Sequence, residues 1–263
     1  MRYNGGRDYP GGEATMSTSE SSASQPVWTI PESLRAQLLA ALSATEAPAA
    51  RMSYEAFLDW ANEDTLAEWV NGEVIMVSPA SARHQQIVNL LVSVLSTFTR
   101  IHDLGLVLDG PFQMKLANSG REPDILFVAK SHLDRLKSTY LDGPADLVIE
   151  VLSPESISRD CGEKFAEYQA AAIPEYWLID PQAELAELYH LDAKGSYQLI
   201  AADDEGRYHS QVLPDLWLRL AWLWADPLPD AEDLLLEIDC DAYARDMIER
   251  LRKRGYLGQD DTP

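Results

Sequence analysis

The chain has 263 residues and a formal net charge of −22 at pH 7, and 46% of its residues are hydrophobic. This length supports one sizeable core, or one core with extensions. The acidic excess argues against a tight, nonspecific DNA binder, because such proteins neutralise phosphates with many Lys and Arg side chains. No apolar run approaches the ~18 residues of a membrane span. The two cysteines are too few for a disulfide framework. We therefore predict a protein of the reducing cytoplasm that makes no use of a membrane.

The first fifty residues differ in composition from the rest of the chain. Residues 1–30 are rich in Ser, Gly and Pro, which predicts a disordered tail. Residues 31–51 include helical apolar spacing over 32–44, which predicts a helical extension. Ser53 then has the position of an N-cap for a short helix over 54–62.

Strand and helix patterns alternate through the next hundred residues. Asn71-Gly72 favours the positive φ angles of a hairpin turn, so two short strands are predicted around it. Residues 82–101 have the apolar spacing of an amphipathic helix. Residues 131–141 are predicted to form a helical crossover between two later strands. The predicted strands of this region cover residues 106–116, 123–129 and 145–153.

The last third of the chain continues this alternation. A helix is predicted over 158–172, and Pro174 marks its end. Apolar segments then predict a three-stranded meander, a Trp-rich segment over 207–224 and a last helix over 230–254. The pattern predicts a single α/β (α+β) domain over 52–225, with a central mixed sheet flanked by helices. Residues 226–263 are predicted to form a C-terminal helical extension.

Glu150 is the most informative residue, because it lies inside the apolar strand DLVIEVL. A lone charge taken out of water costs several kcal/mol or more unless it is paired or bound to a metal. Asp124 opens the preceding predicted strand, and the two carboxylates converge if the strands pair. A hard cation such as Mg²⁺ or Mn²⁺ would turn their repulsion into attraction. The alternatives are a structural Glu150 held by an Arg or backbone N–H groups, and an Asp124 that only serves a turn.

Lys164 follows Glu150 on the next predicted helix, from which it can lean back over the strand end. There it would orient an attacking water and stabilise negative charge; the alternative is a solvated helix lysine. Asp160 lies four residues earlier, and the spacing favours a helix-capping role over a contact with Lys164. Tyr168 is interpreted as a packing residue.

Three further polar residues of the first half are candidates for the site. Glu68 and Glu73 flank the hairpin turn, where either would serve as a further ligand, although surface placement is favoured for both. His84 opens the long helix, and a lone histidine is more often structural. Sequence signatures of other chemistries, such as a phosphate-binding loop, GxGxxG, GxSxG and HExxH, do not occur.

With these residues assembled, the chain resembles the bacterial Uma family of proposed restriction endonucleases, part of the PD-(D/E)XK nuclease superfamily. The resemblance extends over residues 52–225. It rests on SYEAFLDW, EWVNGEVIMVSPAS, REPDILFV, DLVIEVLSPES and RDCGEKFAEYQAAAIPEYWLIDP.

This resemblance implies a restriction-endonuclease-like core. It also implies that Asp124 and Glu150 bind a divalent metal, with the carbonyl of Val151 as a third ligand. The wider superfamily places its lysine two residues after the acid, where this chain has Leu152. Lys164 on the helix is the implied substitute. Glu73 and His84 fall in family motif blocks, so both are expected to line the site.

Two hypotheses for function follow. The first is an Mg²⁺- or Mn²⁺-dependent endonuclease acting on nucleic acid, with DNA as the expected substrate. It needs a basic patch assembled in three dimensions, for which the candidates are Arg83, Arg100, Lys115, Arg121 and Arg159. The second is a non-catalytic protein of the same fold, a metal-binding or protein-interaction module, dimeric through the Trp-rich C-terminal part.

Overall fold

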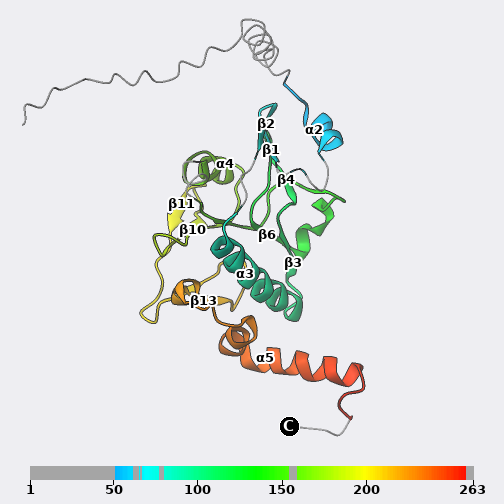
Figure 1. Cartoon of the computed structure of the whole chain (residues 1–263), viewed down its shortest axis with the longest axis vertical. Coiled ribbons are helices and arrows are strands. Elements are labelled where there is room, and N and C mark those ends of the chain that lie inside the picture. Colours follow the sequence, from blue (N-terminus) through cyan, green and yellow to red (C-terminus); the bar gives the residue numbers. More distant parts are fainter. Residues whose placement is uncertain (1–50, 62–64, 66, 77–79, 154–158, 259–263) are drawn as a thin grey trace, which may run out of the picture. The chain divides into compact units, whose positions relative to one another are not determined.

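The computed structural model describes residues 51–61, 65, 67–76, 80–153 and 159–258. The predicted tail and the predicted helix over 32–44 lie outside the described residues. All of these described residues belong to one compact unit, drawn in colour in Figure 1. Of its described helices, none is long and apolar enough to cross a membrane.

The N-terminal elements confirm the sequence predictions. Helix α2 (Tyr54–Trp60) begins after Ser53, whose hydroxyl oxygen accepts a hydrogen bond from the Ala56 N–H at 3.1 Å. Strands β1 (Ala67–Val70) and β2 (Glu73–Met76) form a hairpin. Its turn residues, Asn71 and Gly72, have φ angles of 51° and 92°. Helix α3 (Ala82–Ile101) has the predicted bounds.

The strands form a five-stranded sheet, a six-stranded sheet and a separate pair. The five-stranded sheet has the order β2-β1-β5-β4-β7 and the six-stranded sheet the order β11-β10-β9-β8-β6-β3. Both sheets are mixed, because β4 with β7 and β8 with β9 are parallel pairs among antiparallel ones. The remaining strands are β3 (Gly105–Asp109), β4 (Gln113–Lys115), β5 (Ser119–Arg121), β6 (Ile125–Ala129), β7 (Tyr140–Asp142), β8 (Leu147–Val151), β9 (Glu175–Asp180), β10 (Leu185–Leu191), β11 (Tyr197–Leu199), β12 (Arg207–His209) and β13 (Trp217–Arg219).

Two expectations about this region are corrected. The apolar segment 106–116 divides into β3 and β4, which belong to different sheets. The helical crossover predicted over 131–141 is wrong. A 3-10 helix (Lys130–Arg135) and strand β7 fill this stretch. Strands β6 and β8 are antiparallel, and an antiparallel return needs no long helical crossover.

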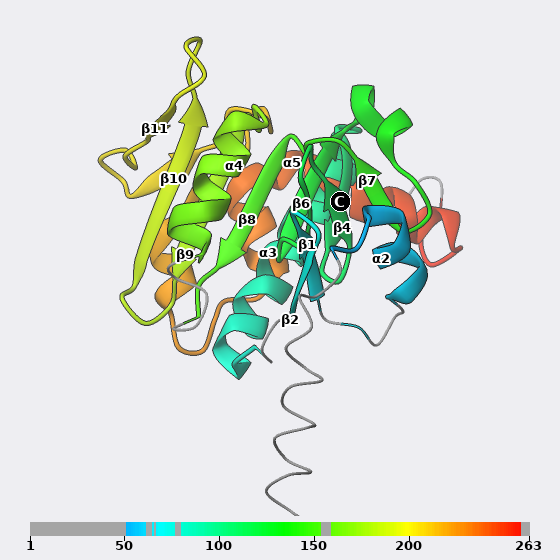
Figure 2. The same ribbon diagram turned by 90° about the horizontal axis from the view of Figure 1, so that it is seen from above.

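The six-stranded sheet is buried on both faces, which explains its apolar strands. Helix α3 packs against one face, where β8 contributes Leu147, Ile149 and Val151. On the other face, Val148 packs with Tyr168 of helix α4 (Phe165–Ala170). Figure 2 shows the ribbon of α4 lying over the strands of this sheet. A π-helical turn, Arg159–Lys164, leads into α4. Glu150 belongs to the α4 face, because successive strand residues point to opposite faces.

The C-terminal part packs onto the same core. Helix α5 (Ala231–Lys253) lies against α3, and Arg100 binds Asp246 of α5 through two hydrogen bonds of 2.7 and 2.9 Å. The Trp-rich segment 207–224 contains β12, β13 and a 3-10 helix (Leu220–Trp224), and Trp222 is only 9% exposed. Arg219 stacks over Trp222 within the chain. The dimer stays a prediction.

Candidate active site

The register of β6 and β8 brings Asp124 and Glu150 together. Ile125 lies opposite Ile149 in this antiparallel pair, so Asp124 lies opposite Glu150 one position further on. Directly opposed residues have Cβ atoms about 4.5–5.5 Å apart. Asp124 Oδ2 accepts a hydrogen bond from the N–H of Val151 at 2.7 Å. The structure therefore places both acids at one end of the strand pair, with the Val151 amide fixing the orientation of Asp124.

His84 joins the site from the first turn of α3. Its Nε2 lies 3.1 Å from Asp124 Oδ2, and the histidine is buried. Burial lowers the pKa of His84, but the hydrogen bond and charge of Asp124 outweigh it, so the pKa lies above its usual value. Ser81 sets the start of this helix, because its hydroxyl oxygen accepts from the His84 N–H. His84 and the Val151 N–H thus hold the same oxygen of Asp124, Oδ2.

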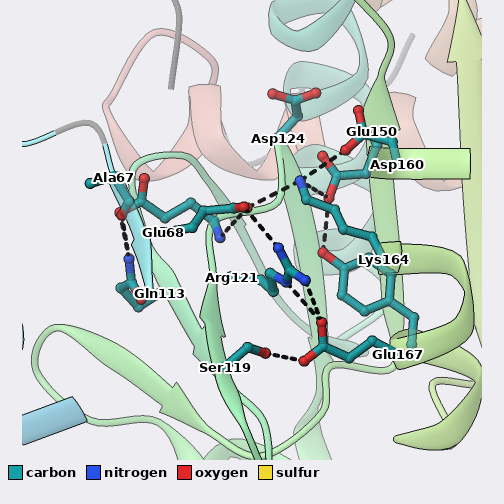
Figure 3. A network of polar contacts seen from close by, with 12 residues as sticks. Ala67, Glu68, Gln113, Ser119, Arg121, Asp124, Glu150, Asp160, Lys164 and Glu167 are labelled. Atoms are coloured by element: carbon teal, nitrogen blue, oxygen red, sulfur yellow. Dashed lines mark hydrogen bonds and ion pairs between the residues drawn. The ribbon is translucent and has the colours of Figure 1, made fainter. Parts of the chain in front are cut away.

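Lys164 reaches Glu150 as expected, but its ammonium lies among carboxylates. Its Nζ is 2.9 Å from Glu150 Oε1 and 3.1 Å from Asp160 Oδ1. Glu68 Oε1 lies 3.1 Å from the same nitrogen (Figure 3). Lys164 is 4% exposed. Of these three contacts, the one to Glu150 has hydrogen-bond geometry, and the other two are ion pairs in which Asp160 Oδ1 has no hydrogen-bond partner among the described residues.

Glu150 is held by a second donor that the sequence did not reveal. The hydroxyl of Tyr168 donates to Glu150 Oε1 at 2.9 Å, so this residue does more than pack. Its position four residues after Lys164 places both donors on the same side of the helical segment. The sequence favours a helix-capping role for Asp160 over a contact with Lys164. The structure instead shows the contact, an ion pair between Asp160 and Lys164.

Electrostatics set the protonation of this cluster. Burial raises the pKa of Glu150 to about 8, against the opposing effect of Lys164, and the charges of Asp160 and Asp124 raise it further. Burial lowers the pKa of Lys164, but the charges of Glu150 and its neighbours outweigh it, so Lys164 stays protonated. Negative groups therefore outnumber positive ones, which favours a cation or an extra proton.

Glu68 is the main site residue that the sequence analysis misplaced. It was expected at the surface, yet it is 1% exposed. Trp69 of β1 lies opposite Gly120 of β5, so Glu68 lies opposite Arg121. Their side chains form an ion pair of 3.2 Å. The available signal was the same as for Glu150, an acid flanked by apolar residues within a strand.

Glu73 is the one predicted site residue that the structure does not bring into this cluster. It is exposed and opens β2 at the turn end of the hairpin. In the β1–β2 register it lies opposite Val70, two positions along the strand from Glu68. The acid that the hairpin supplies to the cluster is therefore Glu68.

The cations named for the expected basic patch make contacts within the protein wherever the structure describes their side chains, and the patch itself stays a prediction. Arg121 is 2% exposed and lies within the acid cluster. Arg83 donates to the carbonyl oxygens of Leu223 and Ala225 at 2.9 and 3.0 Å. Arg100 binds Asp246, and Lys115 lies 3.9 Å from Glu55. The side chain of Arg159 lies outside the described residues.

The donor set fits Mg²⁺ or Mn²⁺ better than zinc. Among the described residues, no three His, Cys, Asp or Glu side chains are placed to hold one ion. Mg²⁺ does not require this, because it usually keeps several waters and uses one or two carboxylates. Asp124 has a side chain that is 25% exposed, and the register of β6 and β8 places this residue opposite Glu150.

Comparison with known proteins agrees with the fold. A crystal structure described as that of a "putative nuclease belonging to DUF820" from Anabaena variabilis matches with a TM-score of 0.56 at 18% sequence identity. The match covers 65% of this chain and 96% of the other. This likeness defines a mixed α/β protein of nuclease fold. No curated protein matches the sequence.

The sequence model of the Uma2 family, described as "Putative restriction endonuclease", matches residues 54–221. The chain belongs to this family. The match begins with α2 and ends within the Trp-rich segment, so it includes every residue of the acid cluster.

Proposed function

We propose that the protein is a divalent-metal-dependent endonuclease that hydrolyses phosphodiester bonds of nucleic acid, with DNA as the expected substrate. The observation that carries this proposal is the pairing of Asp124 and Glu150 across β6 and β8, beside buried Lys164. The nuclease family and fold support it. The carboxylates of the cluster are mostly buried, and Asp124 is the one that solvent reaches. A metal-dependent phosphodiesterase needs such acidic groups to hold its ion where the substrate can approach.

Asp124 and Glu150 would hold Mg²⁺ or Mn²⁺, as the sequence analysis expects. When bound, such an ion polarises a phosphoryl oxygen and offsets phosphate charge. The backbone N–H of Val151 donates a hydrogen bond to Asp124. The predicted role of the Val151 carbonyl oxygen as a third metal ligand would be additional to this hydrogen bond. His84 and the Val151 N–H fix Asp124, while Lys164 and Tyr168 fix Glu150.

The sequence predicts that Lys164 orients an attacking water, but its contacts support a different role. Because its ammonium is within 3.1 Å of three carboxylate oxygens, it acts through these acids. It places positive charge beside Glu150 and keeps one oxygen of this carboxylate occupied. We therefore assign Lys164 as a residue that positions Glu150, and Asp160 as its buried partner.

One observation favours the alternative of a metal-binding or protein-interaction module without catalysis. The cations expected to receive phosphate are engaged elsewhere, as Arg83 and Arg100 show. If these cations do not contact phosphate, a nuclease of this kind would depend on its bound metal ion to attract the substrate. The two functions therefore differ in whether bound Mn²⁺ leads to cleavage.

The deciding experiment is Mn²⁺-dependent cleavage of plasmid, single-stranded DNA and RNA by wild type, Asp124→Asn and Glu150→Gln. We expect each variant to lose more than about 100-fold in rate, since changes in outer-shell partners alone cost about 10–100-fold. Removing metal with EDTA should abolish cleavage. Glu73→Gln is the matched control, because Glu73 is exposed outside the cluster.

Calorimetric titration with Mn²⁺ separates the two functions. Wild type that binds Mn²⁺ but cleaves no polymer would establish the non-catalytic alternative. Wild type that cleaves while both variants retain its rate would refute the assignment of Asp124 and Glu150.

A further inference from the structure

Arg121 is a fully buried arginine that lies one residue layer away from the proposed metal ligands. It ends β5 and is 2% exposed. Its Nη1 donates to Glu68 Oε2 at 3.2 Å. Its Nε and Nη2 both lie 2.8 Å from Glu167 Oε2 on α4. The guanidinium thus links an acid of the five-stranded sheet to an acid of the helix.

These contacts close a ring around the site. Glu68 uses its other oxygen, Oε1, to reach Lys164, and Lys164 in turn binds Glu150. Glu167 belongs to the same helical segment as Lys164, three residues further on. Arg121 therefore fixes Lys164 by two routes, through Glu68 and through the helix, as Figure 3 shows.

Each acid of this ring is held by a further donor. The hydroxyl of Ser119 donates to Glu167 Oε1, and the N–H of Glu122 donates to Glu68 Oε1 at 3.2 Å. Both carboxylates are consequently restrained at two oxygens. A planar guanidinium suits this geometry, because its donors form a rigid fork that a lysine lacks.

We infer that Arg121 is a positioning residue of the proposed nuclease site, acting through Glu68 and Lys164 on Glu150. The inference rests on the proposed function for its catalytic consequence, and on the ring of contacts for its geometry. Replacing buried ion pairs with apolar side chains is often neutral or stabilising, so stability alone does not call for such a ring. The ring lies beside Glu150, and we infer that it is kept in order to position this carboxylate.

The expected effect has a definite direction. Without the fork, Glu68 is released from its fixed orientation, and Lys164 then shares its charge mainly with Glu150 and Asp160. A lysine bound more closely to Glu150 competes with a metal ion for that carboxylate. Loss of Arg121 should therefore weaken Mn²⁺ binding and slow cleavage together.

The test uses the full chain and the variant Arg121→Lys, which keeps the charge but loses the fork. We expect Mn²⁺ affinity and kcat each to fall by about 10–100-fold, as for other outer-shell partners. KM for the nucleic acid should stay within about twofold, because Arg121 is buried away from the substrate. Arg219→Lys is the matched control, since Arg219 faces Glu237 at 3.3 Å outside the site.

A second variant guards against a failure to fold. Arg121→Met with Glu167→Gln removes both partners and keeps the net charge of the cluster, and it should show the same losses with an unchanged near-ultraviolet spectrum. Folded variants that retain wild-type Mn²⁺ affinity would overturn the inference. If wild type cleaves nothing, the proposed function fails, while weaker Mn²⁺ binding by Arg121→Lys alone still supports the positioning role.

Discussion

Glu150, which we propose as a metal ligand, shows at the scale of a single residue what a buried carboxylate costs in stability. Burial raises its pKa to about 8, and the nearby charges of Asp160 and Asp124 raise it further. Lys164 and Tyr168 donate to it but do not compensate fully. Such strain is common at functional sites, where activity and stability make opposed demands.

Replacing Glu150 by Gln should stabilise the metal-free protein at alkaline pH. The folded pKa of about 8 exceeds the ordinary value of 4.5, so the folded state binds more protons than the unfolded state between these values. Stability therefore falls as the pH rises through this window, and Glu150→Gln escapes the loss. In EDTA at pH 9 we expect its Tm to exceed that of wild type by about 3 °C or more, since each kcal/mol shifts Tm by about 2–4 °C at this size.

Thermal unfolding at pH 5 and pH 9 checks this expectation. The difference between variant and wild type should shrink toward pH 5, where Glu150 is protonated in the folded protein. Glu249→Gln serves as the control, because Glu249 lies exposed on α5. A variant less stable than wild type at pH 9 would contradict the account of Glu150.

The same residue scale shows what the sequence could reveal. Asp124, Glu150 and Lys164 were predictable because each stands out within its own segment. Glu68 and Arg121 were not placed correctly, because their pairing depends on the register of β1 with β5, fifty residues apart. Strand β5 contains Ser119 and Gly120, which carry little strand preference, so the segment gave no sign of this pairing.

At the scale of elements, local patterns predicted helices α2, α3 and α5, whereas they predicted a helix wrongly over 131–141 and did not assign strands to their sheets. Helix α3 and the hairpin turn follow from short-range spacing. The division of strands between two sheets depends on contacts between distant segments, which a period-2 pattern does not contain. The meander β9-β10-β11 was predictable because its strands pair in chain order.

The contact between α3 and α5 provides a prediction at this scale. Arg100 donates two hydrogen bonds to Asp246, whose pKa is lowered by them. A lowered pKa contributes stability that is present above the ordinary value of 3.8 and is lost as the pH falls below it. Asp246→Asn should therefore cost about 0.5–1 kcal/mol at pH 7, the upper range for exposed pairs.

Urea unfolding at pH 7 and pH 3 measures this contribution. The difference between Asp246→Asn and wild type should decrease toward pH 3, because the unfolded wild-type chain takes up a proton at this carboxyl group before the folded protein does. A loss that is the same at both pH values would show that the side chain acts by packing alone. Glu249→Gln is again a suitable control, because its partner Lys253 is exposed on the same helix.

At the scale of the whole molecule, the net charge of −22 bears on the proposed binding of nucleic acid. The cations nearest the acid cluster, Lys164 and Arg121, are buried among carboxylates. Arg83 and Arg100 are also engaged. Within the part of the chain that the structure describes, these cations are therefore occupied by internal contacts, and under the proposed function a bound metal ion would provide much of the positive charge that nucleic acid meets.

This charge distribution predicts a shallow salt dependence of nucleic-acid binding. Each neutralised phosphate contributes about −0.9 to the slope of log K against log salt, so a protein with few free cations has a slope shallower than about −4. In EDTA we expect the dissociation constant at physiological salt to be weaker than about 10 µM, near the range for nonspecific binding. Adding Ca²⁺ should tighten binding by bridging Asp124 and Glu150 to phosphate.

Fluorescence anisotropy of a labelled duplex, measured over a salt series with and without Ca²⁺, tests both the slope and the effect of Ca²⁺. A slope steeper than about −4 in EDTA would show that the folded chain presents a basic surface after all, and the metal would then not be its principal attraction for phosphate.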